Sequence, residues 1–202
     1  ASTALYNMQE LLHHGQQMLD SCAHDRKPLS MVVIDCADLH EIRTIYGRDT
    51  ARRVLARVVR KLNAVAGDRG LVARTAPTRF TVLLPGMTRE KACQTIERCL
   101  GAPARFEYDE RGCDIVIVPD FVVDPVRPGM DALARTHDQM CDDLQKSRQA
   151  ALQRERYLTM ERESHSHPAP LVPNLATARP RQANAASAVT PPTVPVPLLR
   201  VG

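Results

Sequence analysis

Apolar and β-branched residues gather in five short runs along the chain. Runs of this length and composition are typical of β-strands. The five runs are Leu29–Asp35, Leu71–Arg74, Arg79–Leu84, Arg105–Asp109 and Cys113–Val123. The third run is almost continuously apolar after Arg79, which favours a central strand covered on both faces. Ala76-Pro77-Thr78 separates it from the preceding run and predicts a tight turn between the two.

Between these runs, apolar residues recur at the spacing of amphipathic helices. The predicted helices are 4–24, Asp38–Tyr46, Arg48–Ala66, Thr88–Leu100 and Met130–Ser147. Gly47 separates the second helix from the third, and Glu110-Arg111-Gly112 joins the last two strands into an antiparallel pair. This order of elements predicts an α+β (mixed α/β) fold, in which helices flank a central mixed β-sheet.

The composition of the chain changes after residue 148. A helical pattern continues there with many charges, and its apolar repeat every seven residues is too short to predict a coiled coil. From residue 165 onward, eight of the 15 prolines occur among alanine, threonine and valine, a composition that buries too little apolar surface to fold alone. A polyproline segment there leaves docking into an aromatic groove open. The expected divisions are a domain over 1–148, a helical extension over 149–164 and a disordered Pro/Ala-rich tail over 165–202.

Charge and hydropathy narrow the class of protein. The formal net charge is +4, and the range 165–202 carries three arginines and no acid, so the rest is nearly neutral and we expect no nucleic-acid partner. No apolar run reaches the length of a membrane span and no signal peptide is visible, which favours a cytoplasmic protein. A preceding sensor or membrane segment stays open, because the sequence starts with Ala-Ser-Thr. The six cysteines form no CxxC pair, which indicates reduced, buried thiols.

The stretch Leu71–Leu84, with the sequence LVARTAPTRFTVLL, resembles the signature hairpin of GGDEF domains (diguanylate cyclases). The pattern of that family is Val-Ala-Arg-x-Gly-Gly-Asp/Glu-Glu-Phe-x-x-Leu-Leu-Pro. The matching residues are Val72, Ala73, Arg74, Phe80, Leu83, Leu84 and Pro85. The start of the chain and its helix near residues 133–138 also resemble the family, so the resemblance covers about 3–148.

The resemblance implies an enzyme that joins two GTP molecules with the help of magnesium held by two carboxylates. Asp35 matches the first carboxylate, at the end of a strand. The five signature positions read Ala76, Pro77, Thr78, Arg79 and Phe80. A hydroxyl and a cation at the third and fourth positions cannot replace two acids around a divalent ion. We therefore predict no bound metal, no cofactor and no cyclase activity, and we expect Asp35 to form an ion pair with Arg79.

The other functional positions of the family are altered as well. Arg43 and Arg52 stand where the family reads guanine with Asn and Asp, and arginine has no hydrogen-bond acceptor for that edge of the base. The family's inhibitory product site, Arg-x-x-Asp, falls on Gly67 and Gly70. Its phosphate-binding lysine falls on Gln145, although Lys146 is adjacent.

These substitutions predict a catalytically inactive GGDEF-like domain that acts as a regulatory or protein-interaction module in bacterial cyclic di-GMP signalling. A protein partner of unknown identity is expected, and a homodimer stays open. The second hypothesis is nucleotide binding without turnover, since Arg43, Arg52, Arg74 and Arg79 are expected to converge on the former active site. The third hypothesis is a residual cyclase that takes its acids from elsewhere.

Overall fold

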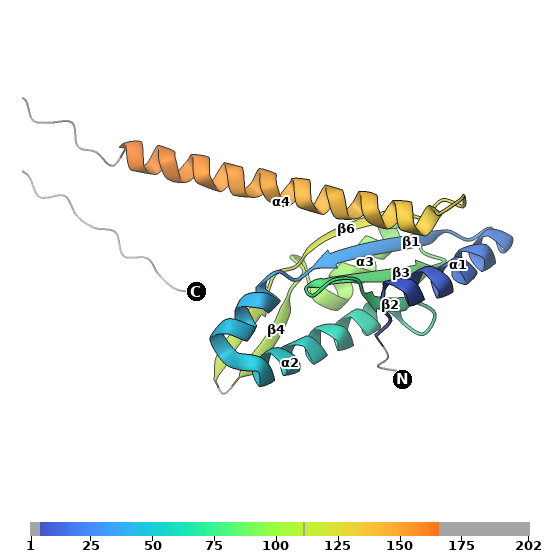
Figure 1. The fold of residues 1–202 in the computed structure, drawn as a ribbon, viewed down its shortest axis with the longest axis horizontal. Coiled ribbons are helices and arrows are strands. Elements are labelled where there is room, and N and C mark those ends of the chain that lie inside the picture. The colour runs from blue at the N-terminus through green and yellow to red at the C-terminus, as the bar shows by residue number, and fades with distance from the viewer. Residues whose placement is uncertain (1–4, 111, 166–202) are drawn as a thin grey trace, which may run out of the picture. The chain divides into compact units, whose positions relative to one another are not determined.

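The centre of the protein is a four-stranded sheet with the strand order β2-β3-β1-β6 (Figure 1). The computed structural model describes residues 5–110 and 112–165. The sheet strands are β1 (Leu29–Asp35), β2 (Leu71–Arg74), β3 (Arg79–Pro85) and β6 (Asp120–Pro125). All three pairings between them are antiparallel. The sequence predicts a mixed sheet, but the parallel pairing among the described residues is limited to a bridge between Tyr6 and Ala73.

Strand β1 separates two hydrophobic cores. Its seven residues are all buried, and they alternate between the two faces of the sheet. Val32 and Ile34 belong to one cluster, whereas Met31 and Val33 belong to the other. Strand β3 is likewise buried along its five inner residues. The prediction of a doubly covered central strand is therefore confirmed, and burial on both faces explains why its sequence lacks polar alternation.

Two helices cover each face of the sheet. The helices are α1 (Met8–His24), α2 (Asp38–Ala66), α3 (Arg89–Leu100) and α4 (Ala132–His165). Residues of α2 and α3, such as Val58 and Ile96, complete the first core. Residues of α1 and α4, such as Leu11 and Met140, complete the second. No helix in the described ranges is long and apolar enough to cross a membrane.

Helix α1 begins later than the sequence predicts. A capping box closes its start, because Asn7 accepts a hydrogen bond from the Glu10 N–H while Glu10 accepts one from the Asn7 N–H. Leu5 and Tyr6, which precede Asn7, lie outside the helix. Tyr6 donates to the Val72 carbonyl at 3.2 Å and accepts from the Arg74 N–H at 2.7 Å, so it lies beside β2. The apolar periodicity from residue 4 therefore includes residues that pair with the sheet.

The predicted strand Cys113–Val123 is wrong as one element. It divides into β5 (Cys113–Ile117), which pairs with β4 (Phe106–Glu110), and β6, which pairs with β1 in the main sheet. Pro119 lies between the two strands, and a proline has no N–H to continue a ladder. The change of sheet brings Asp120 directly opposite Asp35.

Helix α2 breaks at the predicted place. Gly47 has φ 83° and ψ 175° inside a helix that otherwise continues to Ala66. A positive φ is accessible to glycine at little cost, and it redirects the chain between the two helical parts. Helix α4 runs without interruption from Ala132 to His165, so the predicted helix Met130–Ser147 and the helical pattern predicted after residue 148 form one element.

A substitution at Gly70 tests how closely the end of α2 packs against the β2–β3 hairpin. A Cβ at this position would lie 2.4 Å from the Ala66 carbonyl oxygen and 2.8 Å from the Leu83 carbonyl oxygen. Gly70→Ala is expected to lower the free energy of unfolding by about 2 kcal/mol, because backbone atoms must move. Gly129→Ala is the matched control, since its Cβ would meet only an Arg135 side-chain nitrogen at 3.5 Å. Equal urea midpoints for the two variants would contradict this account.

Candidate functional site

The turn between β2 and β3 is held against the end of β1. The N–H groups of Thr75 and Ala76 donate to the Arg79 carbonyl at 3.0 and 3.2 Å, and the Arg79 N–H donates to the Ala76 carbonyl at 3.2 Å. The Cys36 N–H donates to the Thr78 carbonyl at 2.9 Å, so the turn is fixed to the residue that follows β1. Ala76 supplies only backbone groups to this arrangement.

Asp35 is surrounded by hydrogen-bond donors and cations. Thr78 Oγ1 donates to Asp35 Oδ1 at 2.8 Å. Arg79, its partner across the β1–β3 ladder, places Nη2 3.6 Å from Asp35 Oδ2, and Arg148 of α4 places Nη1 3.5 Å from the same oxygen. The predicted Asp35–Arg79 ion pair is therefore present. Its side chains are 10% and 20% exposed, so solvent shields the two charges only partly.

The sequence alone did not identify Arg148 as a partner of Asp35. The two residues are 113 positions apart, and Arg148 is one of many arginines along a charged helical stretch. Only the packing of α4 against the sheet brings this arginine to the end of β1. No local pattern distinguishes it from its neighbours on the same helix.

The arrangement around Asp35 is unfavourable for a divalent cation. Asp120 faces Asp35 across the β1–β6 ladder, and both line a small cavity of about 110 Å³. Arg79 and Arg148 line the same cavity and offset the charge of these two carboxylates. Within residues 5–110 and 112–165, no group of three or more His, Cys, Asp or Glu is placed to hold a metal ion. The donor set at this position therefore does not fit the magnesium ion that the family resemblance implies.

The thiols next to this centre are not activated. Burial raises the pKa of the Cys36 thiol to about 12, and the carboxylates of Asp35 and Asp38 add to the rise. Burial also raises the pKa of Cys141, whose sulfur lies 3.7 Å from His137 Nε2, while burial lowers the pKa of His137. A protonated thiol is a poor nucleophile and a poor metal ligand. The two thiols therefore lack the thiolate character that nucleophilic attack and metal binding require.

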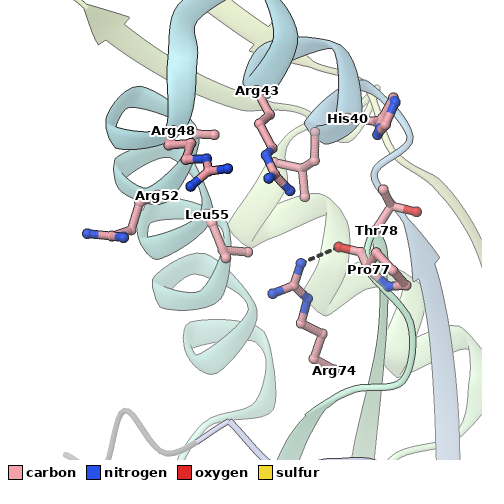
Figure 2. Close-up of a pocket in the computed structure, with 10 residues that line it drawn as sticks. His40, Arg43, Arg48, Arg52, Leu55, Arg74, Pro77 and Thr78 are labelled. Carbon is pink, nitrogen blue, oxygen red and sulfur yellow. Dashed lines mark hydrogen bonds between the residues drawn. The ribbon is translucent and has the colours of Figure 1, made fainter.

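A second cavity, of about 310 Å³, lies between α2 and the hairpin turn (Figure 2). We call it the arginine pocket. Its basic lining residues are His40, Arg43, Arg48, Arg52 and Arg74. Leu39, Ala51, Leu55 and Pro77 supply apolar surface, and Thr78 completes the lining without any carboxylate. Figure 2 shows the Arg43, Arg48 and Arg74 side chains directed toward the space between the elements, with Arg52 turned outward.

The arginines of this pocket differ in how they are held. Arg74 donates a hydrogen bond from Nη2 to the Pro77 carbonyl, and its guanidinium carbon lies 6.0 Å from the centre of the Phe80 ring. The side chains of Arg43, Arg48 and Arg52 make no hydrogen bond or ion pair with any residue of the described ranges. The pocket therefore contains one fixed guanidinium and three that lack a protein partner.

The predicted convergence of four arginines needs one correction. Arg43, Arg52 and Arg74 line the pocket as expected, whereas Arg79 lies outside it and reaches Asp35. Arg48, which the prediction did not include, lines the pocket instead. The sequence carried a signal for it, because Arg48 and Arg52 are four residues apart and so share a face of one helix.

The sequence model of one protein family, described as "Diguanylate cyclase, GGDEF domain", matches residues 1–110. This range is more than half of the 202 residues. The chain belongs to the GGDEF family. The hairpin formed by β2 and β3 lies within the range of this GGDEF domain that the family model matches.

Solved structures of GGDEF domains have the same fold. The active GGEEF domain of a diguanylate cyclase from Vibrio cholerae is 20% identical, with a TM-score of 0.62 and coverage of 73% of this chain and 93% of that chain. The FimX GGDEF domain from Pseudomonas aeruginosa is 20% identical, with a TM-score of 0.58 and coverage of 71% and 91%. The diguanylate cyclase SiaD from Pseudomonas aeruginosa, solved with its activator SiaC, is 18% identical, with a TM-score of 0.61 and coverage of 72%. This chain spans 56% of SiaD.

The two glycines at the expected inhibitory-site positions of this GGDEF domain lie around the end of α2. Gly67 ends the helix with φ 65°, and its N–H donates to the Asn63 carbonyl at 2.9 Å. Gly70 leaves no room for a side chain, because a Cβ would lie 2.4 Å from a backbone oxygen. A carboxylate at Gly70 is therefore incompatible with the backbone seen here.

The Asp35–Arg79 pair can be measured with a double-mutant cycle. Asp35→Asn, Arg79→Gln and the double variant are expected to give a coupling of about 1 kcal/mol in the free energy of unfolding. The buried Arg79 Nε has no hydrogen-bond partner, which limits the gain from the pair. Asp35→Asn should lower the free energy of unfolding more than Arg79→Gln does, because Thr78 and Arg148 still contact Asp35 when Arg79 is removed.

The control for this cycle is the exposed pair Lys27–Asp25. Its side chains are 56% and 50% exposed, and its coupling should be close to zero. A coupling between Asp35 and Arg79 no larger than that of the control pair would contradict the interpretation. A rise in melting temperature with magnesium would contradict it more strongly, because it would show a cation between the two side chains.

Proposed function

We propose that this GGDEF domain is a catalytically inactive, cytoplasmic regulatory module that acts through protein interaction in cyclic di-GMP signalling. The observation that carries the proposal is the engagement of Asp35 by Thr78, Arg79 and Arg148. A diguanylate cyclase needs carboxylates free to hold magnesium against the phosphates of GTP. Here the remaining acid at the end of β1 already has partners, and two of them are cations.

The charge at the fourth signature position opposes metal binding directly. Arg79 and Arg148 lie on the same side of Asp35, at its Oδ2 atom. A divalent cation there would displace both guanidinium groups or approach them at close range, and like charges repel strongly in a partly shielded site. Thr78, at the third position, offers a neutral hydroxyl that is already donated to Asp35. Both alterations favour a site without metal-assisted phosphoryl transfer.

Helix α4 supports a role in protein interaction. From Gln149 to Met160 its side chains are exposed. Several of them are large and apolar, which is unusual on a solvated helix. These residues are Leu152, Tyr157, Leu158 and Met160. A relative with this fold, SiaD, was solved in complex with an activator protein. A protein partner or a second copy of this chain is the occupant that we propose for this helix.

Nucleotide binding without turnover is a second candidate function. The arginine pocket favours it, because the side chains of Arg43 and Arg48, which have no partner among the described residues, are directed into one cavity (Figure 2). Guanidinium groups bind phosphate oxygens through paired, charge-assisted hydrogen bonds. Such binding is compatible with the regulatory role, since a ligand that binds without reacting can still control a partner.

The absence of catalysis is tested by a product assay. The full chain with GTP and either magnesium or manganese is expected to form no cyclic di-GMP above an enzyme-free control, because one engaged carboxylate cannot assemble the metal site. An active GGDEF cyclase assayed in parallel shows that the conditions support turnover. Product that appears with the wild type and disappears with Asp35→Asn would refute the proposal.

The interaction role is tested in cells that lack the native gene. Complementation with Asp35→Asn should restore cellular cyclic di-GMP to the wild-type level, whereas Leu152→Glu/Leu158→Glu should not, because charge on the exposed apolar residues disrupts docking. Gln149→Glu/Gln153→Glu adds the same charge to the same helix and should behave as wild type. Full activity of the leucine variant at normal protein levels would count against α4 as the interaction surface.

A further inference from the structure

The arginine pocket concentrates positive charge, and no acid among the described residues lines it. Arg48 and Arg52 are four residues apart on α2, and like charges at this spacing destabilise a helix. Arg43 approaches from the preceding part of α2, and none of the three has an ionic or hydrogen-bond partner in the described ranges. A bound anion would remove this repulsion, so the pocket is electrostatically suited to a ligand of high negative charge.

The backbone around the pocket presents its donors from several directions. The break at Gly47 places Arg43 on one helical segment and Arg48 on the next (Figure 2). Arg74 enters from the end of β2 and is held in position by its hydrogen bond to the Pro77 carbonyl. Guanidinium forks that converge from separate elements can contact several oxygens of one polyphosphate group. The fixed Arg74 needs little reorganisation when a ligand binds.

The lining contains no residue suited to reading a guanine base. The N1–H and N2–H₂ groups of guanine are donors and require acceptors such as carboxylate or carboxamide oxygens. No Asp, Glu, Asn or Gln lines the pocket. Thr78 donates its hydroxyl proton to Asp35, and its oxygen is a single acceptor that does not match the paired N1–H and N2–H₂ donors as a carboxylate does. The apolar side chains of Leu39, Leu55 and Pro77 can contact a sugar or base without distinguishing one base from another.

The lining also contains no ligand for magnesium. A divalent cation on the phosphates would bring positive charge toward Arg43, Arg48 and Arg74 without any carboxylate to hold it. Magnesium bound to a free triphosphate also neutralises the charge that the arginines would recognise. The cation should therefore compete with this pocket for the ligand.

We infer that the arginine pocket binds the polyphosphate group of a nucleotide or related anion, without a divalent cation and without selecting guanine. The inference rests on the nucleotide-binding candidate above and names its ligand chemistry. It assigns to arginine side chains the charge neutralisation that magnesium provides in a cyclase. A volume of about 310 Å³ suits a ligand no larger than a mononucleotide.

Calorimetric titration of the full chain tests the ligand class. The probes are inorganic triphosphate, ATP, GTP and guanosine, each in EDTA and in excess magnesium. In EDTA the three triphosphates should bind with dissociation constants within about fivefold of one another, and guanosine should show no binding. Excess magnesium should weaken binding of each triphosphate by about tenfold or more, because it neutralises the recognised charge.

Two arginine variants test the pocket itself. Arg43→Gln and Arg48→Gln should each weaken triphosphate binding by about tenfold or more, because each removes charge-assisted hydrogen bonds. Arg57→Gln is the matched control, since Arg57 is an exposed arginine of α2 that lies nine residues, or two and a half turns, beyond Arg48 on the opposite face. The triphosphate affinity of the Arg57→Gln variant should stay within about twofold of the wild-type value. Thermal unfolding of each variant verifies that the domain remains folded, and Arg48→Lys provides a milder change at the same position.

Several results would overturn the inference. These are the absence of binding by all triphosphates at millimolar concentration, binding of GTP that requires magnesium, a preference for GTP over ATP beyond about tenfold, and equal losses for Arg57→Gln and Arg48→Gln. None of them bears on the product assay, which tests catalysis. Conversely, triphosphate binding together with formation of cyclic di-GMP would refute the inactive-module proposal while the binding result still held.

Discussion

The antiparallel register of β1 with β3 places Asp35 opposite Arg79, and much of the structure depends on this pairing. Both strands are buried on two faces, so a shift of one residue would exchange the side chains of the two cores. The register is therefore fixed by hydrophobic packing rather than by the ion pair. Because the packing holds the strand ends in place, Thr78 and Arg79 must lie beside Asp35, whatever chemistry those residues provide.

The basic residues around the β2–β3 hairpin fall into two groups with different partners. Arg79 turns toward Asp35 and, with Arg148, offsets the charge of the acidic strand ends. Arg43, Arg48 and Arg52 lie on the other side of the turn and have no acidic partner in the described ranges. The two regions therefore differ in charge: cations offset the carboxylate of Asp35 at the end of β1, whereas the neighbouring pocket is lined by arginines.

Helix α4 connects the ion-pair centre with an exposed surface. Leu144 packs into the second core, Arg148 reaches Asp35, and the helix then continues with Leu152 and Leu158 exposed. One helix thus carries both Arg148, which contacts Asp35 at the end of β1, and the apolar residues proposed for docking. This continuity gives the interaction proposal a physical connection to the core of the GGDEF domain.

The sequence by itself determined the strands β1, β2 and β3 and the break at Gly47, because these depend on local periodicity and on glycine geometry. It also predicted the Asp35–Arg79 pair through the family resemblance. The predicted tail lies outside the described residues. Only the tertiary structure decided the partition of β5 and β6 between two sheets, the approach of Arg148 to Asp35 and the separation of Arg79 from the arginine pocket. These features arise from contacts between residues far apart in the chain, and such contacts leave no periodic or local signal in a single sequence.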